Sequence, residues 1–553
     1  MAERSTYWGR MGRRSLLRGA LAGSGGLIGA ALIGCGTSKP ASPAGGSSAA
    51  PGAAAPAGET PIVSESFVAA QTRDITALDP MELVYTVGER VGLVYPRLVN
   101  TELASNDPAD IKFSPSYITE GFEMQGSQLT MKLRKGVKYS NIAPLNGREF
   151  VADDVKFSIN RYANDPKSIF KAQYTDITSI ETPDKYTVVF KLKGPTRYLI
   201  TQLAAISALI SPPETVAEYK TKAIGPGPYI HEEMLQGEGS KLRKNPDFVD
   251  AKKIYYNRYL FKVLTDTATR LAAMKAGQVD FGLGGLSPSD MKAMDGANVS
   301  SYPMLSVSTS NITWNSRNPK WKDYRARLAM SKALDRQAII DVTLQKAGVW
   351  TGSVPVDFGK WALSESEVKE INAFKYDPAE AKKLWEAAGR PGMANELYFS
   401  SNGTVGANQA ELFSKQWDQN LGIKTTLKTE DYSIYLTKAY TNKYEDMNTT
   451  SYGVPNWMDH LFEAYLPGGS RNGAGLNDKK VTGMLGELRS TMDDKAAVEK
   501  SKTIQRYIAD NVLSMTQLPT AVTKGVFNAN LRNFKPGLYA PGMEWMLGSW
   551  KAK

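Results

Sequence analysis

The alternation of hydrophobic and polar positions along the chain predicts helices that run directly into strands. One face of residues 410–421 carries apolar side chains at helical spacing, at Ala410, Phe413, Trp417 and Leu421. Residues 423–427 then alternate apolar and polar positions, which is the two-residue period of a strand. We therefore predict a helix followed by a strand, with Trp417 in the core.

The same step from helix to strand recurs elsewhere. Residues 266–277 have a helical pattern and are followed by an apolar–polar–apolar triplet at 279–281. Residues 377–380, Asp-Pro-Ala-Glu, form an N-cap, a proline at the first helical position and a capping-box acid, and Trp385 lies on the apolar face that follows. Because such units occur in both halves of the chain, we predict an α/β fold.

The first sixty residues lack this pattern and indicate a targeting segment. Arg13 and Arg14 precede two leucines, and residues 19–34 contain no charge. A membrane-spanning helix needs about 20 strongly apolar residues, and this stretch is shorter and rich in glycine. It resembles a twin-arginine signal, which directs the export of folded proteins.

The position of the only cysteine indicates a lipid anchor. Cys35 ends the sequence Leu-Ile-Gly-Cys at 32–35, which resembles a lipobox, where the thiol receives a diacylglycerol. Residues 36–60 are almost entirely Gly, Ala, Ser, Pro and Thr, a composition typical of a flexible spacer. We predict a signal peptide over 1–34 and a lipidated tether over 35–60.

Composition and charge exclude several function classes. The 553 residues are 42% hydrophobic and 22% charged, as in ordinary globular proteins, and this length predicts two or three packed units. Residues 1–34 hold five arginines and one glutamate, so they supply +4 of the net charge of +11. The other charges are interleaved and form no basic stripe with aromatic residues, so we expect no nucleic-acid partner.

No catalytic or metal-binding set is evident in the sequence. The two histidines, His231 and His460, lie far from Cys35 in sequence, so neither a zinc site nor a Cys–His nucleophile can be assembled. The glycines at 282–285 lack the spacing of a dinucleotide-binding motif. A hydrolase built on two distant carboxylates stays an open alternative. We expect a binding protein with no cofactor and no metal, rather than an enzyme.

A series of short motifs follows in order along the chain. They are Asp79-Pro80, 133–139 (LRKGVKY), 144–150 (PLNGREF), 152–158 (ADDVKFS), 224–229 (IGPGPY), 243–248 (RKNPDF), 272–280 (AAMKAGQVD), Trp314-Asn315 and 421–424 (LGIK). This ordered set resembles the family 5 extracellular solute-binding proteins, the oligopeptide-, dipeptide- and nickel-binding components of ABC importers. The resemblance spans roughly residues 62–550.

The resemblance implies a two-lobed periplasmic-binding-protein fold with a hinge. Its first lobe is expected to combine residues 61–105, 223–312 and 520–553. An accessory subdomain within that lobe is expected over 106–222, and the second lobe over 313–519.

The resemblance also implies a role. The protein is expected to be a monomeric lipoprotein on the outer face of the cytoplasmic membrane, which captures a small solute between its lobes and delivers it to an ABC permease and ATPase. A non-transport ligand sensor or chaperone with the same fold is an open alternative.

The solute itself stays open between a peptide and an oligosaccharide, with the peptide ahead. Family members that bind peptides hold the α-amino group with an aspartate three residues after a tryptophan. The alignment places Tyr452 at that tryptophan and Pro455 at that aspartate, so the carboxylate is missing. A shifted alignment uses Trp457 and Asp459, one residue short of the usual spacing. Aromatic faces without a fixed anion also suit sugars.

Candidate ligand contacts follow from the resemblance and from the aromatic residues that lack a helical stripe. Glu82 and Tyr85 lie where family members contact ligand from the first lobe, and the others fall in loops or near lobe junctions. The full set is Glu82, Tyr85, Trp314, Asn315, Trp361, Tyr452 and Trp457.

Overall fold

A computed structural model describes residues 59–75, 77–81, 90–101, 111–205, 208–304, 307–390, 394–400, 404–430, 432–454, 456–534, 536 and 547–552. All of these belong to one compact unit. The predicted signal peptide, Cys35 and nearly all of the tether lie outside the described residues, and so do the candidates Glu82 and Tyr85. No helix within the described ranges is long and apolar enough to cross a membrane.

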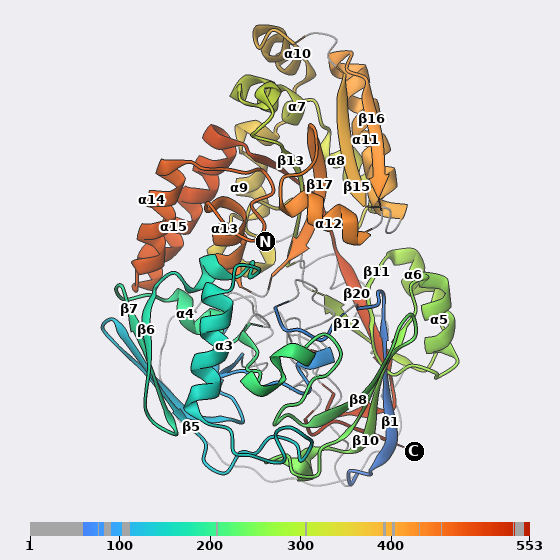
Figure 1. Ribbon diagram of the computed structural model, residues 1–553. Helices are drawn as coiled ribbons and strands as arrows, with labels where there is room; N and C mark the ends of the chain where they lie inside the picture. The colour runs from blue at the N-terminus through green and yellow to red at the C-terminus, as the bar shows by residue number, and fades with distance from the viewer. Residues whose placement is uncertain are drawn as a thin grey trace, which may run out of the picture. The chain divides into compact units, whose positions relative to one another are not determined.

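Two sheets combine segments from the start, the middle and the end of the chain (Figure 1). The first has the order β1-β10-β9-β8, from β1 (Ser64–Gln71), β8 (Tyr229–Leu235), β9 (Gly239–Lys244) and β10 (Tyr256–Val263). The second has the order β11-β20-β12, from β11 (Leu283–Leu286), β12 (Val299–Met304) and β20 (Thr523–Asn528). The three ranges predicted for the first lobe therefore contribute to shared sheets, while the lobe boundaries themselves stay predictions.

Asp280 joins these segments. Its carboxylate, 2% exposed, accepts the Val68 backbone N–H at 3.0 Å and the Asn528 side-chain amide at 3.3 Å, and pairs with Lys551 at 2.7 Å. The strand predicted over 279–281 is reduced to a single bridge between Phe281 and Ala69. The residues that were expected to form a strand instead hold three distant parts of the chain together.

A separate antiparallel sheet occupies the predicted accessory subdomain. Its order is β4-β5-β7-β6, from β4 (Thr119–Gln125), β5 (Gln128–Leu133), β6 (Ile177–Asp184) and β7 (Thr187–Leu192). Helix α3 (Ala152–Asn164) packs on β6 and β7. The alternating residues Leu129, Met131 and Leu133 of β5 are all buried, as expected for one face of a strand.

A mixed five-stranded sheet forms the centre of the predicted second lobe. Its order is β16-β15-β17-β13-β18, from β13 (Ser308–Trp314), β15 (Asn395–Ser400), β16 (Thr425–Glu430), β17 (Met447–Gly453) and β18 (Met515–Leu518). Helix α11 (Thr404–Leu421) ends just before β16, which confirms the predicted helix and strand. Strand β13 begins before the predicted boundary at residue 313.

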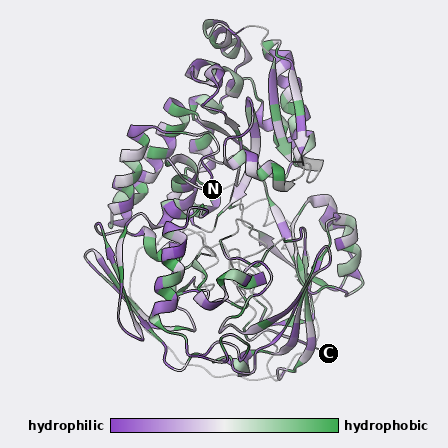
Figure 2. Cartoon of the chain, in the orientation of Figure 1, coloured by the Kyte–Doolittle hydropathy of each residue, from purple (hydrophilic) through white to green (hydrophobic). Residues whose placement is uncertain are grey.

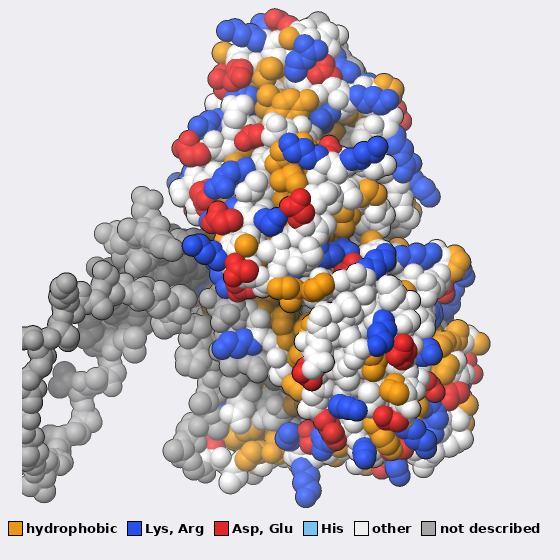
Figure 3. All heavy atoms as spheres, turned by 90° about the vertical axis from the view of Figure 1, so that its left-hand side faces the viewer, with side chains coloured by type: hydrophobic (Ala, Val, Ile, Leu, Met, Phe, Trp, Pro, Cys, Tyr) orange, Lys and Arg blue, Asp and Glu red, His pale blue; other side chains and the backbone are white. Residues whose placement is uncertain are grey.

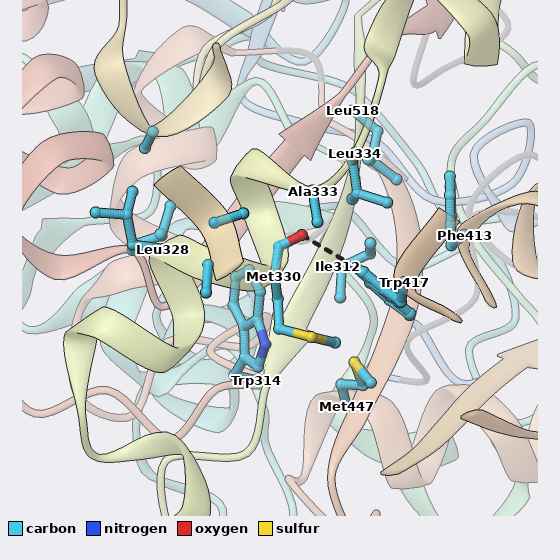
Figure 4. Close-up of a cluster of buried hydrophobic side chains, with 14 of the residues drawn as sticks. Ile312, Trp314, Leu328, Met330, Ala333, Leu334, Phe413, Trp417, Met447 and Leu518 are labelled. Atoms are coloured by element: carbon cyan, nitrogen blue, oxygen red, sulfur yellow. Dashed lines mark hydrogen bonds between the residues drawn. The ribbon is translucent and has the colours of Figure 1, made fainter. Parts of the chain in front are cut away.

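The core beside this sheet contains the tryptophans predicted to be buried. Trp417 is fully buried against Ile312 and Met447, and its indole N–H donates to the Met330 carbonyl at 2.9 Å (Figure 4). Trp385 is 1% exposed on α10 (Pro378–Ala387). The core positions predicted from helical spacing are confirmed.

The start of α10 follows the predicted cap in part. The Asp377 carboxylate accepts the Glu380 backbone N–H at 2.9 Å, and Pro378 occupies the first turn. The Glu380 carboxylate does not complete a capping box, because it pairs with Lys332 at 2.9 Å. The ion pair with Lys332 takes the place of the expected hydrogen bond from the Asp377 backbone N–H to the Glu380 carboxylate.

Further α-helices flank the sheets or pack on one another. They are α4 (Tyr198–Leu203), α5 (Thr267–Lys275), α6 (Pro288–Ala293), α7 (Tyr324–Lys332), α8 (Arg336–Thr343), α9 (Glu365–Lys369), α12 (Tyr432–Tyr440), α13 (Trp457–Tyr465), α14 (Lys479–Ser490) and α15 (Asp494–Tyr507). Hydrophilic and hydrophobic residues alternate around many of them, as expected where one face packs on the core (Figure 2). On the face drawn in Figure 3, basic and acidic side chains are intermingled and form no band of one charge.

Candidate functional site

The predicted accessory subdomain meets the second lobe at a buried carboxylate on α13. Asp459 is 3% exposed, and its Oδ1 accepts hydrogen bonds from the Tyr198 hydroxyl and the Gln202 amide, both at 2.7 Å. One helical turn later, Glu463 accepts the Gln173 amide at 2.6 Å. Tyr198 and Gln202 project from α4, so two short helices far apart in sequence are joined by polar contacts that are shielded from water.

The electrostatics of this contact are unfavourable for a charged Asp459. Burial, together with the neighbouring Glu463 carboxylate, raises the pKa of Asp459 to about 8, against the smaller opposing effects of the bonds from Tyr198 and Gln202 and of the Arg471 charge. The guanidinium of Arg471 binds Glu463 at 2.8 Å. Burial also raises the pKa of Tyr198 well above its ordinary value. The surroundings therefore favour the protonated form of the Asp459 carboxyl in this conformation.

Two arginines extend the contact toward α14 and α15. Arg197 donates to the backbone carbonyls of Thr491 and Met492, both at 2.7 Å, and pairs with Asp494 at 3.1 Å. Arg489 pairs with Asp176 at 3.1 Å. Helices α13, α14 and α15 lie side by side here (Figure 1). The subdomain is thus held by ion pairs of Arg197 and Arg489 and by the buried hydrogen bonds to Asp459 and Glu463.

Two of the predicted ligand contacts, Trp361 and Trp457, are brought together at the same place. Their rings stack with centroids 4.3 Å apart and planes 7° apart, and each side chain is 5% exposed. The Arg197 guanidinium carbon lies 5.5 Å from the centre of the Trp361 ring. In this conformation the two aromatic faces cover each other.

Tyr452 lies close by, on β17. It is 5% exposed, with its ring 5.6 Å from that of His460 and 5.2 Å from the Arg471 guanidinium carbon. Burial raises the Tyr452 pKa well above its ordinary value and lowers the His460 pKa to about 3. The phenol and the imidazole are therefore both neutral at pH 7.

Trp314 and Asn315 lie apart from this group, at the end of β13. Trp314 is 1% exposed and packs near Trp321 in the core, with ring centroids 6.4 Å apart. The Asn315 amide donates to the backbone carbonyls of Tyr444, at 2.5 Å, and Glu445, at 3.1 Å. Packing and backbone hydrogen bonds account for both side chains here, and their role as ligand contacts stays a prediction.

A small pocket adjoins the buried acids. Its empty volume is about 210 Å³, which includes space open to solvent. It is lined by Ile169, Ala172, Gln173, Tyr198, Phe462, Glu463, Leu466, Gly469 and Ser470. No cluster of three or more His, Cys, Asp or Glu side chains in the described part of the chain is placed to hold a metal ion. No local pattern predicts a role for Tyr198, Gln202 or Gln173, because their partners lie more than 250 residues away.

The sheets, their chain order and the accessory subdomain define a two-lobed α/β protein of the periplasmic-binding class. Solved structures that share this fold include two that hold a bound peptide. The periplasmic binding protein DppA from Helicobacter pylori, in complex with the peptide STSA, aligns with a TM-score of 0.78 and 18% identity over 89% of this chain and 99% of that one. The oligopeptide-binding protein AppA from Bacillus subtilis, in complex with a nonapeptide, aligns at 0.78 and 21% identity over 89% and 100%.

The family follows from the sequence comparison. The model of the bacterial extracellular solute-binding proteins, family 5, matches residues 112–473, so the chain belongs to this family, as the ordered motifs predicted. A related protein is the di/tripeptide-binding protein 3 of Pseudomonas aeruginosa strain UCBPP-PA14, 24% identical over 447 residues, which is 74% of this chain and 81% of the relative.

Proposed function

We propose that this protein captures a peptide outside the cytoplasmic membrane and delivers it to an ABC importer. The observation that carries the proposal is the family 5 match over residues 112–473, together with the names of relatives that bind di- or tripeptides. It acts by binding and carries out no catalysis, consistent with a family defined by solute binding.

The solute binds between the lobes and closes them. A ligand shifts the balance between open and closed forms only if it binds the closed form more tightly, and contacts from both lobes supply that difference. Tyr85 is the proposed contact from the first lobe, and Tyr452 and Trp457 are those from the second. The faces of Trp361 and Trp457 that stack on each other must separate before those faces can contact a solute.

One observation favours an oligosaccharide as the second candidate. Neither possible anchor for a peptide α-amino group is available, because Pro455 replaces the aspartate of one alignment and Asp459 of the other is buried against Tyr198 and Gln202. A cleft with aromatic faces and no free carboxylate suits a neutral sugar. A ligand sensor or chaperone remains a third possibility on the same fold.

The proposed location follows from the N-terminal motifs. Lipidation of Cys35 after export by the twin-arginine route holds a monomeric protein on the outer face of the cytoplasmic membrane, within reach of its permease and ATPase. The spacer that ends near residue 60 gives the folded part freedom to move.

Native mass spectrometry of the protein purified from its own host tests the proposal directly. We expect a copurified mass that fragments as a short peptide, and calorimetry with that peptide should then give saturable binding. A copurified hexose series that binds in the same assay would establish the oligosaccharide reading instead. If neither class binds, solute capture in the cleft is wrong.

A further inference from the structure

We infer that the contact between α4 and α13 is a proton-dependent latch. Asp459 holds a proton while the contact is formed and releases it to solvent when the contact opens. The accessory subdomain supplies Tyr198 and Gln202, and the second lobe supplies Asp459. The inference rests on the lobe closure proposed above, because a latch needs two parts that separate.

The distribution of charge around α13 provides the first argument. Asp459 and Glu463 lie one helical turn apart and are 3% and 6% exposed. The adjacent cation, Arg471, binds Glu463 at 2.8 Å, and no lysine or arginine in the described ranges forms an ion pair with Asp459. An ionised Asp459 would be a buried charge without a counter-ion, which is strongly unfavourable, whereas a protonated carboxyl is not.

The hydrogen bonds of Gln202 provide a second, independent argument. Its Nε2 donates to Asp459 Oδ1 at 2.7 Å, while its Oε1 is buried and receives no hydrogen bond from any described residue. A protonated carboxyl offers an acceptor and a donor on the same group. Protonation of Asp459 therefore supplies an O–H donor of the kind that the Gln202 carbonyl lacks. An ionised carboxylate has no hydrogen to donate.

The other cations that face the contact are committed elsewhere. Arg489 pairs with Asp176 at 3.1 Å, although its guanidinium carbon lies 4.9 Å from the centre of the Tyr198 ring. Arg197 pairs with Asp494, which is 62% exposed. These ion pairs join the same two parts of the chain and use carboxylates other than Asp459, so they support the contact without pairing with Asp459.

The direction of the pH effect follows from linkage. Burial and the Glu463 carboxylate raise the Asp459 pKa to about 8 in the formed contact, whereas an opened, hydrated Asp459 returns to an ordinary value near about 4. Rising pH therefore favours the open form. The ratio of latched to open protein should fall by up to about tenfold per pH unit between these values and level off above pH about 8. His460 is neutral across this range, since burial lowers its pKa to about 3.

A distance measurement without any ligand tests the latch. Nitroxide labels at Lys193→Cys and Glu499→Cys, two exposed positions on opposite sides of the contact, are introduced into the full chain carrying Cys35→Ala. Pulsed electron paramagnetic resonance should show a short distance near pH about 5 and a growing longer distance toward pH about 8. With Asp459→Asn, which keeps the acceptor and cannot ionise, the short distance should persist over the whole range.

The matched control is Asp494→Asn, which neutralises an exposed carboxylate in the same interface and should leave the pH dependence in place. If the wild-type distances do not respond to pH, or if Asp459→Asn responds as the wild type does, the latch is wrong. Should Asp459→Asn not fold, infrared spectroscopy of the wild type must show a buried protonated carboxyl that titrates with the distance change, and its absence overturns the inference. Because no solute is added, these outcomes are independent of whether the protein binds peptides.

Discussion

The indole rings of Trp361 and Trp457 stack face to face, 4.3 Å between centroids, although 96 positions of sequence separate them. Both tryptophans belong to one buried hydrophobic cluster, which also contains Tyr198 of the predicted accessory subdomain. The stack therefore belongs to the buried packing where α4 meets α13.

Trp361→Ala should destabilise the protein by about 3–5 kcal/mol, because it removes a buried indole and its stacking contact with Trp457. Urea unfolding followed by circular dichroism measures the change. Trp361→Phe retains an aromatic face and should lose much less. A loss below about 1 kcal/mol for the alanine variant would mean that the stack contributes little to stability.

Tyr85→Ala should weaken solute binding by about 1–3 kcal/mol, roughly 5- to 150-fold, if Tyr85 contacts the solute from the first lobe. Calorimetric titration with the copurified solute gives the affinity. Tyr376→Ala, which removes an exposed tyrosine of the second lobe, is the control and should bind normally. Equal affinities for both variants would place the cleft elsewhere.

His460→Phe should make the protein less sensitive to acid. Burial lowers the folded-state pKa of His460 to about 3, below its ordinary value near about 6.5, so the unfolded state binds the proton more readily. The stability that the neutral imidazole provides is complete above pH about 6.5 and is lost, by up to about 1.4 kcal/mol per pH unit, as the pH falls toward about 3. Phenylalanine cannot bind a proton, so it abolishes this pH-dependent contribution to stability. An aromatic ring also suits a site beside the ring of Phe358.

Urea unfolding at several pH values checks this prediction. The slope of stability against pH below about 6.5 should be smaller in the variant than in the wild type. His231→Phe is a useful comparison, because burial lowers the pKa of His231 to about 4. The stability that the neutral His231 provides is therefore lost over a narrower pH range. Parallel slopes for the wild type and His460→Phe would show that His460 does not control acid sensitivity.

Cys35→Ala should abolish the lipid anchor, because no other thiol exists in the chain. Mass spectrometry of the membrane fraction should find an acylated N-terminal cysteine in the wild type and none in the variant. Cys35→Ser offers the same test with an almost unchanged shape. Fatty acid on either variant would contradict lipidation at this residue.

Arg13→Lys combined with Arg14→Lys should leave precursor in the cytoplasm, since the twin-arginine route reads the paired guanidinium groups rather than their charge alone. Fractionation and immunoblotting follow the precursor. Changing Arg4 and Arg10 to lysine is the control and should not affect export. Normal export of the Arg13–Arg14 double variant would indicate the general secretory route.

The local sequence was sufficient to predict those elements whose formation depends on residues close together in the chain. The spacing of Phe413 and Trp417 predicted α11 and its buried face, and the N-cap Asp377 predicted where α10 begins. The ordered motifs predicted the fold and the family, since they preserve a whole arrangement of elements. The helices depend on short-range periodicity, and the fold and family depend on the complete series of ordered motifs.

The contacts at the candidate site depend on residues that no local pattern relates. Asp459 and Tyr198 lie 261 positions apart, and nothing near either residue indicates a partner. Trp314 is predicted as a ligand contact from its place near a lobe junction, and in this conformation its side chain on β13 is buried in the core. A single sequence does not reveal which aromatic residues face solute and which face one another.

The meeting of distant segments at Asp280 bears on when the protein reaches its folded state. Strand β20 pairs with β11 and β12, and Lys551 lies almost at the end of the sequence. The sheet that these strands form therefore stays incomplete until β20, long after β12 in the sequence, has left the ribosome, and closing such long loops is slow. An export route that waits for a finished fold would suit this order of events, since a chain threaded outward as it is made would expose β11 and β12 without their partner.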